Sequence, residues 1–112
     1  MHISLRQQLI EETVTLIRRA SPLVATIARR DRDLASQIRR ALSSVGLNLA
    51  EGFGNAQGNS RLRFESARGS LYEAQAGVKI AAAWGYLSVE ECAPLLQEMD
   101  RLAARVFGVM RK

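Results

Sequence analysis

The spacing of apolar residues constrains the fold more than any other feature of this chain. Four segments carry apolar side chains three or four residues apart, which places them on one face of an α-helix, and no segment shows the alternation of a strand. These segments cover residues 4–30, 33–53, 60–84 and 88–111 of a 112-residue chain. Short connections join them, except for a glycine-rich loop over residues 52–60. The pattern predicts a single all-α domain, an antiparallel up-down four-helix bundle.

Polar residues suited to capping stand before three of the predicted helices. Asp31 or Asp33 can cap the second helix, and Asn59 or Ser60 can cap the third. Residues 88–91 read Ser-Val-Glu-Glu, a capping-box pattern that predicts the start of the fourth helix.

Glycine and proline mark further ends and bends. Gly85 stands where a left-handed C-terminal cap belongs after the third helix. Pro22 lies inside the first predicted helix and should kink or split it, because proline removes a backbone hydrogen bond and clashes one turn back. Pro94 lies just past the first turn of the fourth helix and can delay or bend its start.

An amide and a carboxylate lie among apolar side chains near the end of the second segment. Asn48 falls on the apolar face itself, where an unpartnered amide costs a few kcal/mol. Gly69 on the third segment would let the two backbones approach closely. We therefore hypothesise an inter-helix polar network that fixes the register of the helices. Its members would be Asn48, Glu51, Arg68, Ser70 and Glu73.

Catalytic and metal-binding groups are scarce in the sequence. His2 is the sole histidine, and Cys92 has no second cysteine or histidine at ligand spacing. No phosphate-cradling glycine loop follows a strand, and no Glu-x-x-His pair is present. Glu51 and Glu73 could form a carboxylate pair, but structural pairing with arginine is the better interpretation. We expect no enzyme activity, no metal and no cofactor.

The charge is strongly positive, at +5 with an isoelectric point of about 10.3, and nearly all of it is arginine. Arginine suits bidentate phosphate contacts, so a basic surface favours salt-sensitive, sequence-independent binding of DNA or RNA. Asp31 and Asp33 interleave the densest run and neutralise part of it, and the aromatic residues look like core or cap residues rather than a base-stacking platform. The candidate nucleic-acid contacts are Arg18, Arg19, Arg29, Arg30, Arg32, Arg39, Arg40, Arg61 and Arg63.

A second interpretation is a scaffold that binds a partner protein without nucleic acid. The first segment carries more apolar residues than a four-helix core can cover, which also favours self-association. Trp84-Gly85-Tyr86 would form an exposed corner. No signal peptide or membrane-spanning run is expected, and a lone cysteine fits a reducing compartment, so a cytoplasmic location is expected.

Several motifs together resemble a known bacterial family. They are Gln-Ile-Arg-Arg-Ala at 37–41, Asn-Leu-Ala-Glu-Gly-Phe-Gly at 48–54, Arg-Phe at 63–64, Ala-Arg-Gly-Ser-Leu-Tyr-Glu at 67–73 and Gly-Tyr at 85–86. The pattern is similar to four-helix-bundle proteins encoded in intervening sequences of large-subunit ribosomal RNA genes. The same family includes the accessory variability determinant of diversity-generating retroelements. The resemblance covers residues 34–87 well, and the flanking helices by pattern only.

The resemblance implies a fold and partners but no enzymatic activity. Members form antiparallel bundles that assemble into barrel-shaped homopentamers, so a ring-shaped homo-oligomer is expected. The retroelement member binds nucleic acid and contacts a reverse transcriptase. The carried-over positions, which look structural, are Asn48, Glu51, Gly52, Arg68, Gly69, Ser70 and Glu73. Two departures from the family's pattern weaken the expectation of nucleic-acid binding. Asn55 stands where an arginine is common, and residues 29–33 read Arg-Arg-Asp-Arg-Asp where the family has a proline-containing turn.

Overall fold

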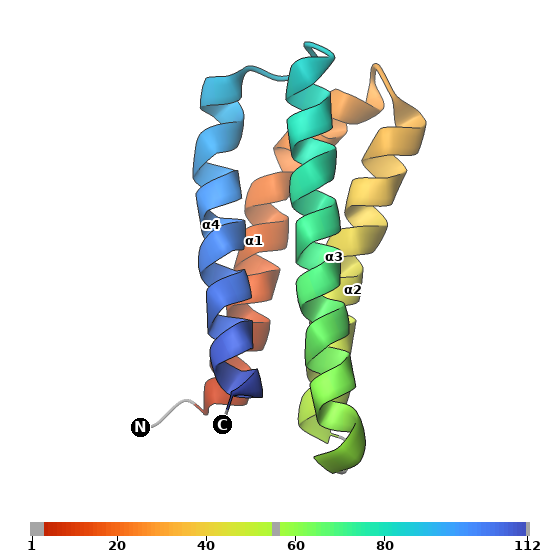
Figure 1. Cartoon of the computed structure of the whole chain (residues 1–112). Helices are drawn as coiled ribbons and strands as arrows, with labels where there is room; N and C mark the ends of the chain where they lie inside the picture. The colour runs from red at the N-terminus through yellow and green to blue at the C-terminus, as the bar shows by residue number, and fades with distance from the viewer. Residues whose placement is uncertain (1–3, 55–56, 112) are drawn as a thin grey trace.

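Four helices make up the described part of the chain. The computed structural model describes residues 4–54 and 57–111. It contains α1 (Leu5–Ala28), α2 (Arg32–Gly54), α3 (Gln57–Ala83) and α4 (Val89–Met110), and no strand in those residues. Figure 1 shows them running alternately up and down, with both ends of the chain at the same end of the bundle. The predicted all-α four-helix bundle is confirmed.

The core forms from the apolar face of each helix. Thr13 also lies in this core, and its hydroxyl is satisfied because it donates to the Leu9 carbonyl at 2.8 Å. The third helix buries the whole of its predicted face, with small side chains that let its neighbours come close. That face consists of Phe64, Ala67, Leu71, Ala74, Val78 and Ala81.

Capping sets two helix starts as the sequence predicts. The Asp31 side chain accepts a hydrogen bond from the Leu34 backbone N–H at 3.0 Å and so caps α2, whereas Asp33 lies inside the first turn. Ser88 and Glu91 form the expected capping box, so Pro94 does not delay α4.

A Schellman-type turn ends α3 at Gly85, whose φ of 82° is the left-handed conformation that glycine adopts without strain. The Tyr86 N–H donates to the Ala81 carbonyl, and the Tyr86 hydroxyl donates to the Asp31 carboxylate at 3.2 Å. The α3–α4 turn is therefore tied to the α1–α2 turn at the same end of the bundle.

The connection between α2 and α3 is shorter than the predicted loop over residues 52–60. Gly52 lies in α2, and Asn59 and Ser60 lie in α3, so neither of the latter is the cap that the sequence suggested. The Ser60 hydroxyl instead donates to the Gly52 carbonyl at 2.7 Å and satisfies an end of α2. Phe53 packs edge-to-face on Phe64, with ring centroids 5.1 Å apart.

Pro22 does not split the first helix, which runs unbroken from Leu5 to Ala28. Pro22 is exposed, so water can satisfy the carbonyl one turn before it. In Figure 1 the second half of α1 leans toward α2. No helix in the described part of the chain is long and apolar enough to cross a membrane.

Glycines allow close packing of α2 on α3 at Gly52, a position that the sequence predicts to be structural, and at Gly77, which the sequence pattern did not single out. A Cβ on Gly52 would lie 2.5 Å from the Phe64 ring, and a Cβ on Gly77 would lie 2.6 Å from Ile38. A Cβ on Gly69 would meet nothing within 4 Å. The proposed close approach at Gly69 is therefore wrong, because this residue faces solvent, and Gly77 has that role instead.

Candidate functional site

The outer side of α2 carries arginines without any acidic residue nearby on the helix. Residues 34–50 contain no Asp or Glu. A shallow hollow of about 570 Å³ lies on this side. We call it the α2 face, and its lining residues are Ser36, Arg39, Arg40, Ser43, Ser44 and Leu47.

The chemistry of the α2 face suits an anion. Arg40 donates to the Ser36 hydroxyl at 2.8 Å, and Arg39 has no hydrogen-bond or ion-pair partner among the described residues. Both guanidinium groups are exposed, and hydroxyls surround them. Guanidinium and hydroxyl donors are the groups that most often contact phosphate oxygens.

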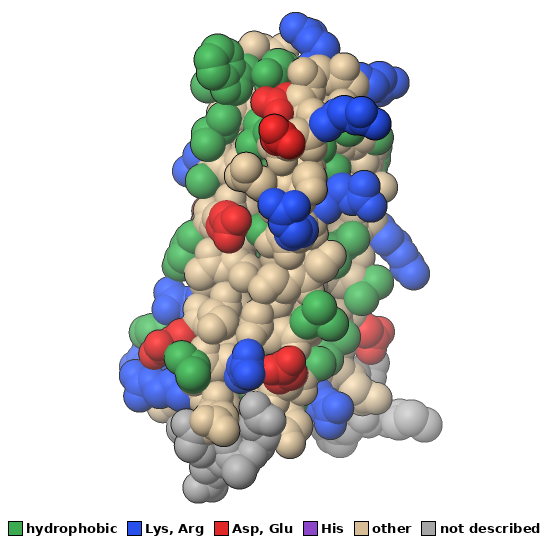
Figure 2. Space-filling view, turned by 90° about the vertical axis from the view of Figure 1, so that its right-hand side faces the viewer, with side chains coloured by type: hydrophobic (Ala, Val, Ile, Leu, Met, Phe, Trp, Pro, Cys, Tyr) green, Lys and Arg blue, Asp and Glu red, His purple; other side chains and the backbone are tan. Residues whose placement is uncertain are grey.

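A second hollow, of about 410 Å³, adjoins the α2 face in the groove between α1 and α2. It shares Arg39 and Ser43 with the α2 face, and small or apolar residues form the rest of its lining. Figure 2 shows this side of the molecule, with Lys and Arg side chains gathered over its upper right part. Basic groups thus extend from the α2 face toward the α1–α2 turn.

The remaining predicted arginines fall into two groups. Arg18 and Arg32 are exposed, Arg29 donates to Thr26, and Arg30 lies over the Tyr86 ring at 5.5 Å. None of these four forms an ion pair with a described residue. The other three are paired, in Arg19–Glu98, Arg61–Glu65 and Arg63–Glu51. Pairing with a carboxylate makes those three poor phosphate contacts.

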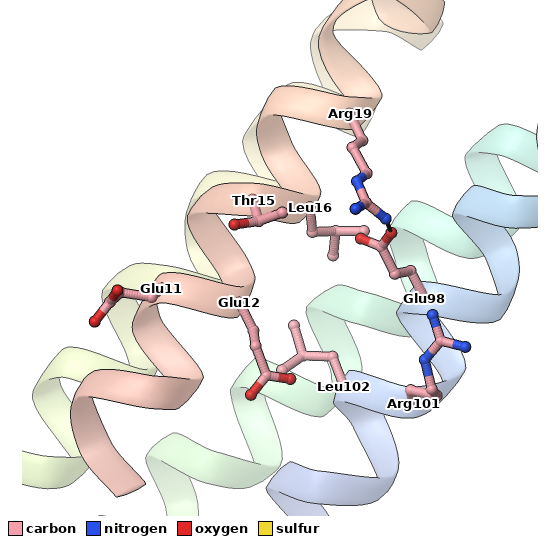
Figure 3. Close-up of a pocket in the computed structure, with 8 residues that line it drawn as sticks. All are labelled: Glu11, Glu12, Thr15, Leu16, Arg19, Glu98, Arg101 and Leu102. Atoms are coloured by element: carbon pink, nitrogen blue, oxygen red, sulfur yellow. Dashed lines mark hydrogen bonds and ion pairs between the residues drawn. The ribbon is translucent and has the colours of Figure 1, made fainter. Parts of the chain in front are cut away.

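The groove between α1 and α4 is also hollow but differs in charge. Figure 3 shows this hollow of about 290 Å³, with the Arg19 guanidinium directed at Glu98 across it and Glu11 pointing away from α4. Arg105 pairs with Glu12 in the same groove. Acidic and basic side chains are balanced here, so the α1–α4 groove has no net preference for an anion.

The predicted polar network forms only in part. Asn48 donates to the carbonyl and hydroxyl of Ser44, both at 2.9 Å, and Ser70 on α3 donates to the Ser44 hydroxyl at 2.9 Å. Asn48 and Ser70 are thus linked across α2 and α3 through Ser44, a residue that the sequence pattern did not single out. Glu51 is not part of the link, because it pairs with Arg63 at 2.9 Å on the surface.

Arg68 and Glu73 do not join that network either. Arg68 donates to the Tyr72 hydroxyl at 2.9 Å on the α4 side of α3, because it stands two positions before Ser70 and so points about 200° away from it around the helix. Glu73 is exposed and has no partner among the described residues, so it does not pair with Glu51. The proposal of a five-residue network is therefore wrong for Glu51, Arg68 and Glu73.

Metal-ligating side chains do not cluster in the described residues. No group of three His, Cys, Asp or Glu residues that could hold a metal occurs in residues 4–54 and 57–111. Burial raises the pKa of the Cys92 thiol, and the neighbouring Glu91 carboxylate raises it further, so this thiol is a packing group. His2 and Asn55 lie outside the described residues.

Comparisons with known proteins agree with the fold. A family model described as "23S rRNA-intervening sequence protein" matches residues 7–108. The structure is similar to a crystal structure of a protein of unknown function from the S23 ribosomal protein family of Bacteroides thetaiotaomicron. The TM-score is 0.88 at 12% identity, over 97% of this chain and 100% of that one. Curated proteins give no match.

Proposed function

The chain belongs to the 23S rRNA-intervening sequence protein family, and from this premise we propose that it is a non-enzymatic adaptor that binds nucleic acid through phosphate contacts. The observation that carries the proposal is the α2 face, where Arg39 and Arg40 stand among hydroxyls without a carboxylate partner. The net charge of +5 supports it, because a basic protein attracts a polyanion over long range. Residues that read bases in a known motif are not visible, so the binding is sequence-independent.

The test is binding of the purified protein to labelled duplex DNA and structured RNA over a salt series. We expect micromolar or tighter binding at low salt that weakens steeply as salt rises, because bound phosphates release counterions. The double variant Arg39→Gln/Arg40→Gln should bind more weakly. Its salt slope should fall by roughly 0.9 for each phosphate that the protein no longer neutralises.

A matched control removes the same charge elsewhere. Arg6→Gln/Arg101→Gln takes two exposed arginines from α1 and α4, neither of which forms an ion pair with a described residue. We expect a smaller loss of affinity from this control than from the α2 pair. Equal losses would mean that net charge, not the α2 face, drives binding, and no binding at low salt would reject the proposal.

Self-association is part of the proposal. The resemblance implies a ring-shaped homopentamer, which would repeat the α2 face around the assembly. Exposed apolar side chains support it: α1 leaves Val14 exposed and Ile10 and Ile17 half-buried. Native mass spectrometry should give a single closed oligomer, and a monomer at micromolar concentration would contradict this part.

A scaffold for a partner protein is the alternative, in which the same bundle works without nucleic acid. Trp84 is 68% exposed and Val89 is 69% exposed beside the α3–α4 turn, an apolar corner of the kind found at protein interfaces. The resemblance offers a reverse transcriptase as one such partner, and a cytoplasmic location fits both functions. An intact oligomer that binds neither DNA nor RNA at any salt concentration would favour the scaffold.

A further inference from the structure

An aromatic and cationic cluster lies on the α3–α4 side of the bundle, away from the α2 face. The Arg68 guanidinium lies over two rings, 5.6 Å from the centroid of Tyr72 and 4.7 Å from that of Phe107. Arg111 lies 5.7 Å from the same Phe107 ring. We call these four residues the aromatic patch.

The rings of the aromatic patch are open to solvent. Tyr72 is 48% exposed and Phe107 is 42% exposed, which corrects the expectation that both are core or cap residues. Glycines on each helix leave room beside them, because a Cβ on Gly69 or Gly108 would meet nothing within 4 Å. A flat molecule can therefore approach the exposed parts of the rings and the guanidinium planes that lie over them.

The cations of the aromatic patch have no carboxylate partner among the described residues. Arg68 donates to the Tyr72 hydroxyl, and its buried Nε has no hydrogen-bond partner. Arg111 forms no ion pair with a described residue. Both guanidinium groups lie against aromatic rings and pair with no described carboxylate, so their positive charge is available to a ligand.

We propose that the aromatic patch stacks unpaired bases, so that this protein binds single-stranded nucleic acid in preference to duplex. Base faces stack on aromatic rings and guanidinium planes whatever their sequence, and nearby arginines contact the phosphates. Paired bases inside a duplex do not present their faces, so the selectivity is for single strands and loops. The inference rests on the proposed function, to which it adds a second contact surface and a substrate class.

The aromatic patch and the α2 face lie at the same level of the bundle. The hydrogen bond between Ser44 and Ser70 joins the α2 face to α3, and Ser70 stands two residues from both Arg68 and Tyr72. Two residues turn a helix by about 200°, so Arg68 and Tyr72 point away from α2. A strand that contacts both surfaces would therefore pass around the outer side of α3, a helix about 10 Å across.

The experiment compares an oligothymidylate with an abasic oligonucleotide of the same length and charge. Both contact the α2 face through phosphates, but only the first has bases to stack. We expect wild-type protein to bind the oligothymidylate at least fivefold more tightly, since one stacked base gives roughly that factor. Phe107→Leu should bring the ratio close to one without changing affinity for the abasic strand, because leucine keeps apolar contact but has no π-face.

Two further variants make the assignment specific. Tyr72→Leu, in α3, should also reduce the ratio of the affinities for the two strands. Phe53→Leu makes an equal change at a half-buried phenylalanine in α2 and should leave that ratio unchanged. Circular dichroism checks that each variant is folded. Equal wild-type affinities for the two strands, or a ratio that survives both patch variants, would overturn the inference while leaving the proposed function standing. Binding of duplex DNA but of neither strand at low salt would also overturn the inference, and failure to bind duplex DNA as well as both strands would instead reject the proposed function.

Discussion

The α2–α3 pair and the α1–α4 pair hold their helices together in different ways. In the α2–α3 pair the backbones approach closely, because Gly52 faces the Phe64 ring and Gly77 faces Ile38. One hydroxyl pair, Ser44 with Ser70, adds a short polar link. Close packing and this link position the two helices, and the Arg63–Glu51 ion pair joins them at the surface, whereas Arg39 and Arg40 on the outer side of α2 take no part in these contacts.

In the α1–α4 pair, charged side chains span an open groove. Arg19 pairs with Glu98 and Arg105 pairs with Glu12, on either side of the hollow shown in Figure 3. Each of these arginines is occupied by a carboxylate. Arg39 and Arg40 on the α2 face differ from them, because neither forms an ion pair with a described residue.

The largest effect should come from breaking the close approach in the α2–α3 pair. Gly77→Ala puts a methyl group 2.6 Å from Ile38, which must shift, so we expect unfolding free energy to fall by about 1–3 kcal/mol in urea titration. Gly69→Ala on the same helix meets nothing and should stabilise by up to about 1 kcal/mol through helix propensity. Equal changes in unfolding free energy for the two variants would contradict the difference in packing between Gly77 and Gly69.

The next prediction adds a carboxylate to the α2 face, so that an arginine there is paired as the arginines of the α1–α4 groove are. Ser43→Glu places an acid one turn after Arg39, within reach of its guanidinium. We expect nucleic-acid affinity to fall about tenfold at low salt although no arginine is removed. Ser43→Gln has the same size without the charge, and a similar loss with this control would show that bulk, not charge, is responsible.

The apolar pattern predicts the four helices and their buried faces because those depend on local periodicity. The same reasoning correctly assigned Gly85 and Ser88 and offered Asp31 as one of two caps for α2, because these caps are made with neighbours in sequence. Partners across helices were not predictable in this way. Asn48 bonds to Ser44 on its own helix, whereas the bond from Ser70 to Ser44 depends on the rotation and spacing of packed helices, which the sequence does not state.

The candidate site was predicted unevenly for the same reason. The sequence set apart only the arginine run beside Asp31 and Asp33. The structure separates the paired Arg19, Arg61 and Arg63 from the other proposed arginines, because their carboxylates lie on neighbouring turns or helices. The absence of acidic residues from 34–50 was visible in the sequence and marks the α2 face. The exposure of Tyr72 and Phe107 was not visible, since aromatic residues at helical spacing usually face the core.

A smaller effect is expected from removing a carboxylate in the α1–α4 groove. Glu98→Gln releases Arg19 and should lower unfolding free energy by about 0.2–1 kcal/mol, as exposed ion pairs do. The loss should shrink in high salt, because screening already weakens the pair in the wild-type protein. Glu73→Gln removes an exposed carboxylate without a described partner and should change nothing; thermal unfolding at two salt concentrations compares the two.

The smallest effect concerns the contact that joins the two pairs at the end of the bundle, where Tyr86 donates to Asp31. Burial raises the pKa of the Tyr86 hydroxyl, and the charge and hydrogen bond of Asp31 raise it further, against a lowering by Arg30. A raised pKa means that the fold favours the neutral phenol. Its contribution to stability is therefore complete below the unfolded pKa of about 10 and is lost as pH rises through the folded value.

The difference in unfolding free energy between wild type and Tyr86→Phe should thus be constant near neutral pH and diminish above about pH 10. A difference that stays constant through pH 11 would show that the hydroxyl does not couple the two turns, and that packing and other contacts, such as the hydrogen bond from Gln75 to Asp100, join the α2–α3 pair to the α1–α4 pair.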